Sequence, residues 1–337
     1  MRGCSRSERS GGSQIMTQVR TLGLALCGAA LMLAVAHAQT SLSSKELAEK
    51  VPIADVHRHV QRWVSPSLLK QQMEEQNVAW SGAVGPPFGP WDTEPYFQLL
   101  GKKYIPTAGQ VELTSIYMQH GAGGLTDISL DTYKNLLQAS DQLFATGRIK
   151  GFGELILNNQ TTNPVAAFRR KVKIDAAPVE AMFKIAAKHR GFIQIHAEDD
   201  ADSVDQIKSL ATQYKEVSIV LSHCLFTANV ALVRSLLGQH ENIYCEMSAR
   251  SRSHFPNVDN ERIRQRVIYG EDFAKEEWIQ LMEEFPTRFM VGTDTYNPNV
   301  NFEKNVAEIR KGLLSRLQPS TIELVAYKNA QRVMRLE

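Results

Sequence analysis

Short apolar runs that end in a histidine or an acid recur along most of this chain, and helical patterns separate them. Strands that alternate with helices are typical of a parallel sheet with crossover connections. The first run leads into Asp55-Val56-His57-Arg58-His59, and later runs end at or near Glu154, His196, His223 and Asp294. The pattern predicts an α/β fold, a (β/α)8 TIM barrel, for which the length is sufficient.

The expected strands lie at eight places: 51–56, 77–84, 103–108, 150–157, 192–196, 217–223, 242–247 and 289–293. The expected helices are 130–144, 177–189, 204–214, 229–237, 273–285, 302–317 and 322–336. Glycine and proline clusters predict loops at 85–91 and 121–124. A parallel barrel gathers the carboxyl ends of its strands at one face, so distant polar residues can meet there.

The His57-x-His59 pair follows an apolar strand and an aspartate, a position that favours a metal site. Side chains two residues apart on an extended backbone point to the same side, so both imidazoles can reach one ion. Asp55 shares that side, either as a group that orients a histidine or as a hydrogen-bond partner early in the strand. Imidazole and carboxylate ligands together suit zinc or another first-row divalent ion.

The ordered set of His-x-His, Glu, His, His and Asp resembles the amidohydrolase superfamily of metal-dependent barrel hydrolases. Within it, the sequence is most similar to the amidohydrolase-related branch, with TatD-like hydrolases nearby. The resemblance covers roughly residues 50 to 335. It is carried by Ile-His-Ala-Glu at 195–198, Tyr-Cys-Glu-Met-Ser-Ala-Arg at 244–250, Gly-Thr-Asp-Thr-Tyr at 292–296 and Asn329-Ala330.

The resemblance implies one or two divalent metal ions, with zinc expected and manganese an alternative. His57, His59 and Asp294 would hold one ion. His196 and His223 would hold a second, with Glu154 as the bridge, as in TatD-like members. A bound ion lowers the pKa of its water to about 7. Asp294 would accept the proton of that water and pass it to the leaving group.

Four charged or aromatic residues near strand ends are candidates for substrate binding: Arg58, Glu198, Arg250 and Tyr296. The alternative for each is a surface charge or a structural ion pair. The sequence as a whole predicts a hydrolase that cleaves an amide, ester, lactone or phosphoester bond of a small polar substrate. A decarboxylase of the same branch and a metal-retaining binding barrel without turnover are the alternatives.

The first 38 residues are predicted to be a secretory signal, which leaves residues 39–337 as a single barrel domain. Arg20 precedes an apolar stretch from Leu22 to Val35, and Ala36-His37-Ala38 is a small-x-small cleavage signal. Either Met1 or Met16 is the initiator. We therefore expect a secreted or periplasmic protein with no membrane attachment after cleavage.

Net charge argues against nucleic acid as a partner. The signal carries three net positive charges against a total of +2 for the chain, so the remaining residues have a net charge of −1. Only Cys224 and Cys245 follow the signal. We favour buried free thiols, although a disulfide is possible if their strands are neighbours. The sequence does not predict an oligomeric state.

Overall fold

The computed structural model describes residues 42–61, 63–86, 92–255, 261–296 and 300–337, with the backbone alone for 261–263. The predicted signal, 1–38, lies outside the described residues, as does most of the predicted loop 85–91. Within the described ranges, no helix has both the length and the apolar character needed to cross a membrane.

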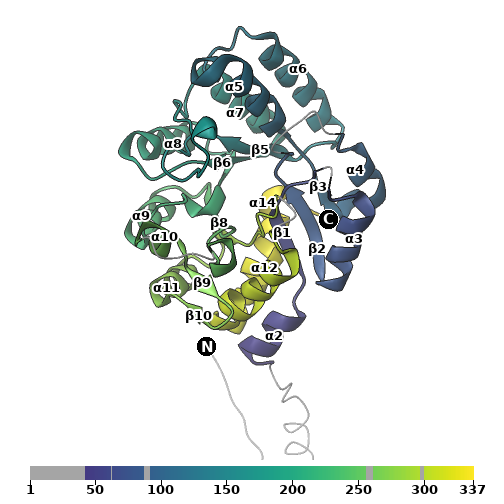
Figure 1. Ribbon diagram of the computed structural model, residues 1–337, viewed down its shortest axis with the longest axis vertical. Helices are drawn as coiled ribbons and strands as arrows, with labels where there is room; N and C mark the ends of the chain where they lie inside the picture. Colours follow the sequence, from purple (N-terminus) through teal and green to yellow (C-terminus); the bar gives the residue numbers. More distant parts are fainter. Residues whose placement is uncertain (1–41, 62, 87–91, 256–260, 297–299) are drawn as a thin grey trace, which may run out of the picture. The chain divides into compact units, whose positions relative to one another are not determined.

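Parallel strands form the centre of the molecule, and helices surround them (Figure 1). One sheet has the order β1-β2-β3, and the other has the order β11-β8-β7-β6-β5-β4. The strands are β1 (Ile53–Arg58), β2 (Val78–Ala83), β3 (Tyr104–Ile105), β4 (Thr107–Gly109), β5 (Gly151–Ile156), β6 (Phe192–His196), β7 (Ser218–Leu221), β8 (Ile243–Glu246) and β11 (Phe289–Met290).

Two junctions join these sheets into a barrel. Pro106 separates β3 from β4, because proline has no N–H to donate to a neighbouring strand. On the other side, the Val56 N–H donates to the Val291 carbonyl at 3.1 Å and the Asp294 N–H donates to the His57 carbonyl at 2.7 Å. With β3 and β4 as one interrupted strand, the described residues provide eight strand positions around the core, which confirms the predicted (β/α)8 barrel.

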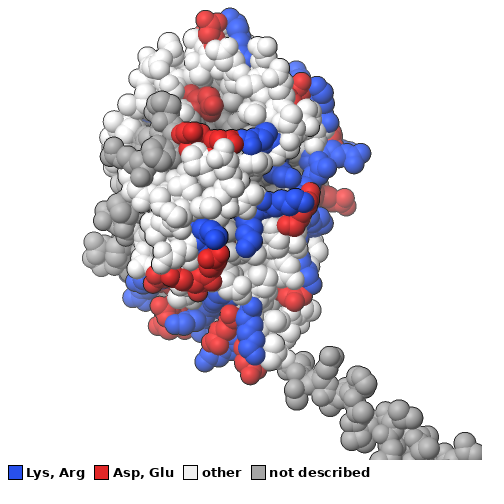
Figure 2. All heavy atoms as spheres, turned by 90° about the vertical axis from the view of Figure 1, so that its right-hand side faces the viewer, with Lys and Arg blue, Asp and Glu red and all other residues white. Residues whose placement is uncertain are grey.

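The helices follow the strands along the chain. They are α2 (Ser44–Lys50), α3 (Pro66–Glu75), α4 (Glu94–Leu100), α5 (Gln110–Gly124), α6 (Asp131–Ala145), α7 (Ala177–His189), α8 (Ala201–Gln213), α9 (Val230–Gln239), α10 (Glu261–Arg266), α11 (Glu276–Glu284), α12 (Phe302–Glu308), α13 (Pro319–Glu323) and α14 (Asn329–Met334). A short antiparallel hairpin, β9 (Tyr269–Gly270) and β10 (Phe273–Ala274), lies outside the barrel sheets. Basic and acidic side chains lie intermixed on the face shown in Figure 2.

Helix α7 illustrates why the segments fold as predicted. Pro178 stands in its first turn, where the missing N–H has no intrahelical partner to lose. Val179, Met182, Phe183 and Ala186 recur at helical spacing and are buried against the barrel. The same periodicity predicted this helix from the sequence with the observed bounds.

The structure differs from the sequence predictions at 121–124 and at the two cysteines. Residues 121–124 were expected to be a loop, but they belong to α5, which changes direction at Gly121 with φ 68°. Glycine permits that backbone, so the glycine cluster produces a kink instead of ending the helix. Cys224 and Cys245 form a disulfide rather than free thiols, because β7 and β8 are neighbours in the sheet.

We predict opposite effects on stability for two glycine-to-alanine substitutions. A Cβ at Gly312 would overlap the backbone oxygen of Gly270, whereas a Cβ at Gly238 in α9 would meet no atom of the described residues within 4 Å. Gly312→Ala should lower the free energy of unfolding by about 1–3 kcal/mol through overpacking. Gly238→Ala should raise it by about 0.5–1 kcal/mol. Denaturant titration measures both, and equal effects would contradict the packing described at β9.

Candidate metal centre

The six residues singled out in the sequence meet at the carboxyl ends of five barrel strands. β1 carries His57, and His59 lies just past its end. Glu154 comes from β5 and His196 from β6. His223 follows β7, and Asp294 follows β11. The common end of the strands therefore brings together residues that are up to 237 positions apart.

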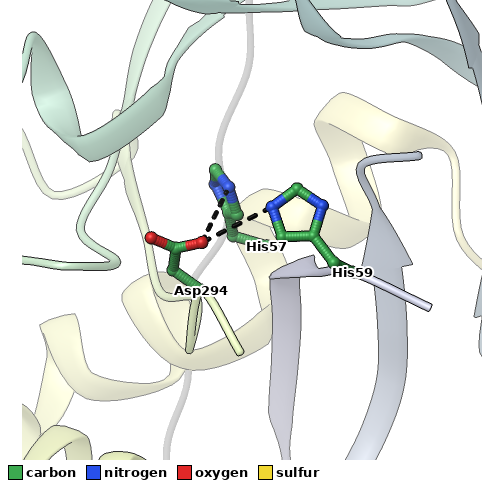
Figure 3. Close-up of side chains that lie close together, drawn as sticks. All are labelled: His57, His59 and Asp294. Atoms are coloured by element: carbon green, nitrogen blue, oxygen red, sulfur yellow. Dashed lines mark ion pairs between the residues drawn. The ribbon is translucent and has the colours of Figure 1, made fainter. Parts of the chain in front are cut away.

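His57, His59 and Asp294 form the first group of possible metal ligands (Figure 3). Asp294 Oδ1 lies 3.6 Å from His57 Nε2 and 3.5 Å from His59 Nε2. Glu154 Oε2 lies 3.6 Å from His57 Nε2 and 3.9 Å from His59 Nε2. Ligand atoms placed tetrahedrally at about 2.1 Å from a zinc ion would be about 3.4 Å apart, so this spacing fits one ion.

The other carboxylate oxygen of Glu154 faces the remaining two histidines. Glu154 Oε1 lies 3.4 Å from His223 Nε2 and accepts a hydrogen bond of 2.8 Å from His196 Nδ1. His57, Glu154 and His223 form a second group of possible ligands. His196 joins this group through its hydrogen bond to Glu154.

An unpaired nitrogen in this cluster also fits a metal ion. Among the described residues, Nε2 of His57 is buried, belongs to both groups of possible ligands and has no hydrogen-bond partner. Buried polar atoms are rarely left unpaired, and a metal ion would supply this nitrogen with a partner. The donor set of imidazole nitrogen and carboxylate oxygen is the one that zinc and related ions prefer.

For His59 and His223, the protein holds the side of the ring opposite Nε2. His59 Nδ1 donates to the Gly85 carbonyl at 2.8 Å, and His223 Nδ1 lies 2.9 Å from Ser248 Oγ. Such hydrogen bonds fix the ring orientation and leave Nε2 free for an ion. The cluster is therefore oriented by the fold before any ion binds.

Glu246, at the end of β8, is a site residue that sequence reasoning missed. Its Oε2 accepts hydrogen bonds from His57 Nδ1 at 2.8 Å and from the His223 backbone N–H at 3.2 Å. Gln194 Nε2 also lies 3.0 Å from His57 Nδ1. The available signal was an acid inside the apolar run Ile-Tyr-Cys-Glu-Met at 243–247, which is costly to bury without a partner.

Charges in the cluster shift its titration. Burial by itself would lower the pKa of His57, but Glu246, Glu154 and Asp294 raise that pKa well above its usual value. Burial would raise the pKa of Glu154, yet the nearby histidines hold it well below the normal range. The pKa of Asp294 is lowered in the same way, chiefly by His57. The three carboxylates thus favour a positive charge at the position of His57.

Asp55 acts on the backbone and not on a histidine ring. Its carboxylate accepts from the Thr293 N–H at 2.8 Å, from the Thr293 hydroxyl at 2.8 Å and from the His57 N–H at 3.3 Å. It therefore ties β1 to the segment that carries Asp294. The structure therefore supports the role of Asp55 as a hydrogen-bond partner early in the strand and not as a group that orients a histidine ring.

Arg58 and Glu198 do not fit the substrate-binding role predicted for them. Arg58 is buried on the opposite side of β1 from His57, where Nη2 donates to Gln72 and the guanidinium lies 4.4 Å from the centre of the Phe302 ring. Glu198 accepts from the Thr161 N–H at 2.6 Å and from its hydroxyl at 2.9 Å. Both side chains hold the barrel and its loops together.

Arg250 is also structural, whereas Tyr296 keeps a position suited to substrate contact. The Arg250 side chain is fully buried and donates to the carbonyls of Phe226 and Ala228 at 2.6 and 3.3 Å. Tyr296 is 42% exposed, and its ring centre lies 6.5 Å from that of His59. His254, which the sequence reasoning did not consider, places Nε2 3.9 Å from Asp294 Oδ2.

Solved structures share this fold at low sequence identity. An amidohydrolase from Burkholderia multivorans with bound HEPES gives a TM-score of 0.53 at 16% identity and covers 85% of this chain and 100% of its own. The zinc-bound form of that protein has a TM-score of 0.51 at 15% sequence identity, with the same coverage. A probable 2-pyrone-4,6-dicarboxylic acid hydrolase from Acinetobacter baumannii with citric acid bound has a TM-score of 0.52 at 12% identity. The match covers 84% of this chain and 99% of that one.

No protein-family model matches this chain, and no curated protein matches it in sequence. The structural likeness confirms the barrel fold predicted from the sequence. The metal-binding roles of the individual residues remain predictions that rest on the geometry above.

Glu246→Gln is predicted to weaken metal binding without unfolding the protein. Glutamine keeps the shape of the side chain but removes the charge that orients His57, and loss of such a partner typically costs about 10–100-fold in metal affinity. Competition with a zinc chelator measures the change. The matched control is Glu303→Gln, an exposed residue of α12. Equal zinc affinity in the two variants would contradict the role given to Glu246.

Zinc binding at pH 7 is predicted to release protons. The carboxylates raise the pKa of His57 above 6.5, so the metal-free site holds a proton there that an ion must displace. The affinity for zinc should fall as the pH drops through the raised pKa of His57, and it should become independent of pH above that pKa. Calorimetry in buffers with different enthalpies of ionisation counts the protons. Binding without proton release at pH 7 would contradict the shift.

Proposed function

We propose that this chain is a metal-dependent hydrolase of the amidohydrolase superfamily that acts on a small polar substrate. The observation that carries the proposal is the position of Glu154, with one oxygen beside His57 and His59 and the other beside His223. An acid placed between two groups of histidines suits one or two divalent ions. The solved neighbours described as an amidohydrolase and a hydrolase support the same class.

A divalent ion in this centre would acidify an attacking water and polarise the oxygen of an amide, ester, lactone or phosphoester bond. Zinc is the ion we propose, since one solved neighbour carries it. His57, His59 and Asp294 would hold the ion together with Glu154. His223 and His196 would hold a second ion on the other side of Glu154.

Asp294 is suited to move a proton. Its Oδ1 faces both His57 and His59, and its Oδ2, 3.9 Å from His254 Nε2, would accept a proton from the attacking water and pass it to the leaving group. His57 and its neighbours lower the pKa of Asp294, so this carboxylate is ionised at neutral pH, the form that can accept a proton. Tyr296, at the exposed side of His59, is proposed to contact the substrate.

We further propose that the protein is exported to the periplasm or secreted. The buried disulfide between Cys224 and Cys245 supports this location, because disulfides persist in oxidising compartments. The predicted signal at 1–38 supports it independently.

Asp294→Asn should retain the fold and lose turnover by about 10²–10⁴-fold, the usual loss for a general base. Hydrolysis is assayed on panels of esters, lactones, amides and phosphoesters, with the metal content of each variant determined alongside. Asp205→Asn, at an exposed position of α8, is the control. Full turnover by a metal-loaded Asp294→Asn variant would remove Asp294 from the mechanism.

The same assay, with a second panel of aromatic acids, separates the alternatives. A decarboxylase would release carbon dioxide from aromatic acids and leave the ester and lactone panels untouched. Arg250, a predicted substrate contact for either reaction, is engaged with backbone carbonyls and so favours neither of them. A binding barrel would retain zinc and turn over nothing in either panel.

A further inference from the structure

The Cys224–Cys245 disulfide links residues that adjoin two members of the candidate metal centre in the sequence. Cys224 follows His223 in the turn after β7, and Cys245 precedes Glu246 in β8. Their Cα atoms are 4.5 Å apart, and both residues are fully buried. The cross-link therefore joins the immediate neighbours of two residues of the centre.

The turn that carries His223 has an unfavourable backbone. His223, Cys224 and Leu225 have φ angles of 55°, 51° and 53°, and none of them is glycine. Left-handed backbone is disfavoured for residues with a Cβ, and here it occurs at three successive positions. The surrounding structure must hold such a turn, because the isolated segment would prefer other conformations.

Two contacts beside the cross-link hold His223 in the turn. Glu246 Oε2 accepts from the His223 N–H at 3.2 Å, and Ser248 Oγ lies 2.9 Å from His223 Nδ1. Both partners belong to β8 or the segment after it, on the side to which Cys245 anchors the turn. A shift of the turn away from β8 would break both contacts and move His223 Nε2 from its place 3.4 Å from Glu154 Oε1.

We propose that the Cys224–Cys245 disulfide is a positioning element of the metal centre. It holds the left-handed turn against β8, and so keeps His223 aimed at Glu154 and Glu246 bonded to His57. The affinity of the centre for a divalent ion then depends on the disulfide. This inference rests on the proposed function, since it takes the histidine and acid cluster to be a metal site.

The test compares zinc binding by three forms of the protein. The oxidised wild-type chain, C224S/C245S and C224G/C245S are titrated with zinc against a chromophoric chelator. We expect C224S/C245S to bind zinc about 10-fold more weakly or worse, the usual effect of losing a group that orients a ligand. Glycine accepts a positive φ, so C224G/C245S should regain part of that loss. A purely structural disulfide would not produce this rescue.

Circular dichroism shows whether each variant is folded, and wild-type protein refolded in a phosphine reductant provides the reduced comparison without a substitution. Equal zinc affinity in the oxidised wild type, the reduced wild type and C224S/C245S would overturn the inference and leave the proposed function in place. Equal weakening in the serine and glycine variants would overturn the role of the turn. No zinc binding by the oxidised wild type would instead overturn the metal centre itself.

Discussion

Burial of several carboxylates at one end of the barrel is the constraint on which the site depends. Glu154 and Glu246 are almost completely withdrawn from water, Asp294 nearly so, and all three lie around the ring of His57. Ionised carboxylates are costly to bury unless positive charge compensates them. A protonated His57 supplies that charge in the metal-free protein, and a divalent ion would replace it. The pKa of His57 is raised because the three carboxylates around it favour a positive charge at this position.

Most of the barrel could be predicted because strands that are buried on both faces have nearly continuous apolar sequences. The polar residues that end those runs had to meet once the strands were parallel, so the sequence alone was enough to place His57, Glu154, His223 and Asp294 together. Strand ends were less predictable. The expected strand at 289–293 is only two residues long, because Asp55 and backbone bonds from β1 take over the pairing there.

The position of a charged residue in the sequence does not predict which loop atoms its side chain contacts. Arg58 ends β1 and Arg250 follows β8, yet Arg58 bonds Gln72 of α3 and Arg250 donates to carbonyls of the loop after β7. The sequence showed Glu246 as an acid in an apolar run. Its role in orienting His57 depends on a hydrogen bond between β8 and β1 that the sequence does not reveal. The pairing of Cys224 with Cys245 likewise depended on two strands being neighbours. The unpredicted parts are those decided by contacts between distant segments.

Anomalous diffraction from crystals of the zinc-supplemented protein, recorded at energies above and below the zinc absorption edge, is the decisive test of the metal centre. We predict an anomalous peak at about 2.0–2.2 Å from Nε2 of His57, Nε2 of His59 and a carboxylate oxygen of Asp294. Well-ordered crystals with these side chains in place and no anomalous peak between them would contradict a cation site there.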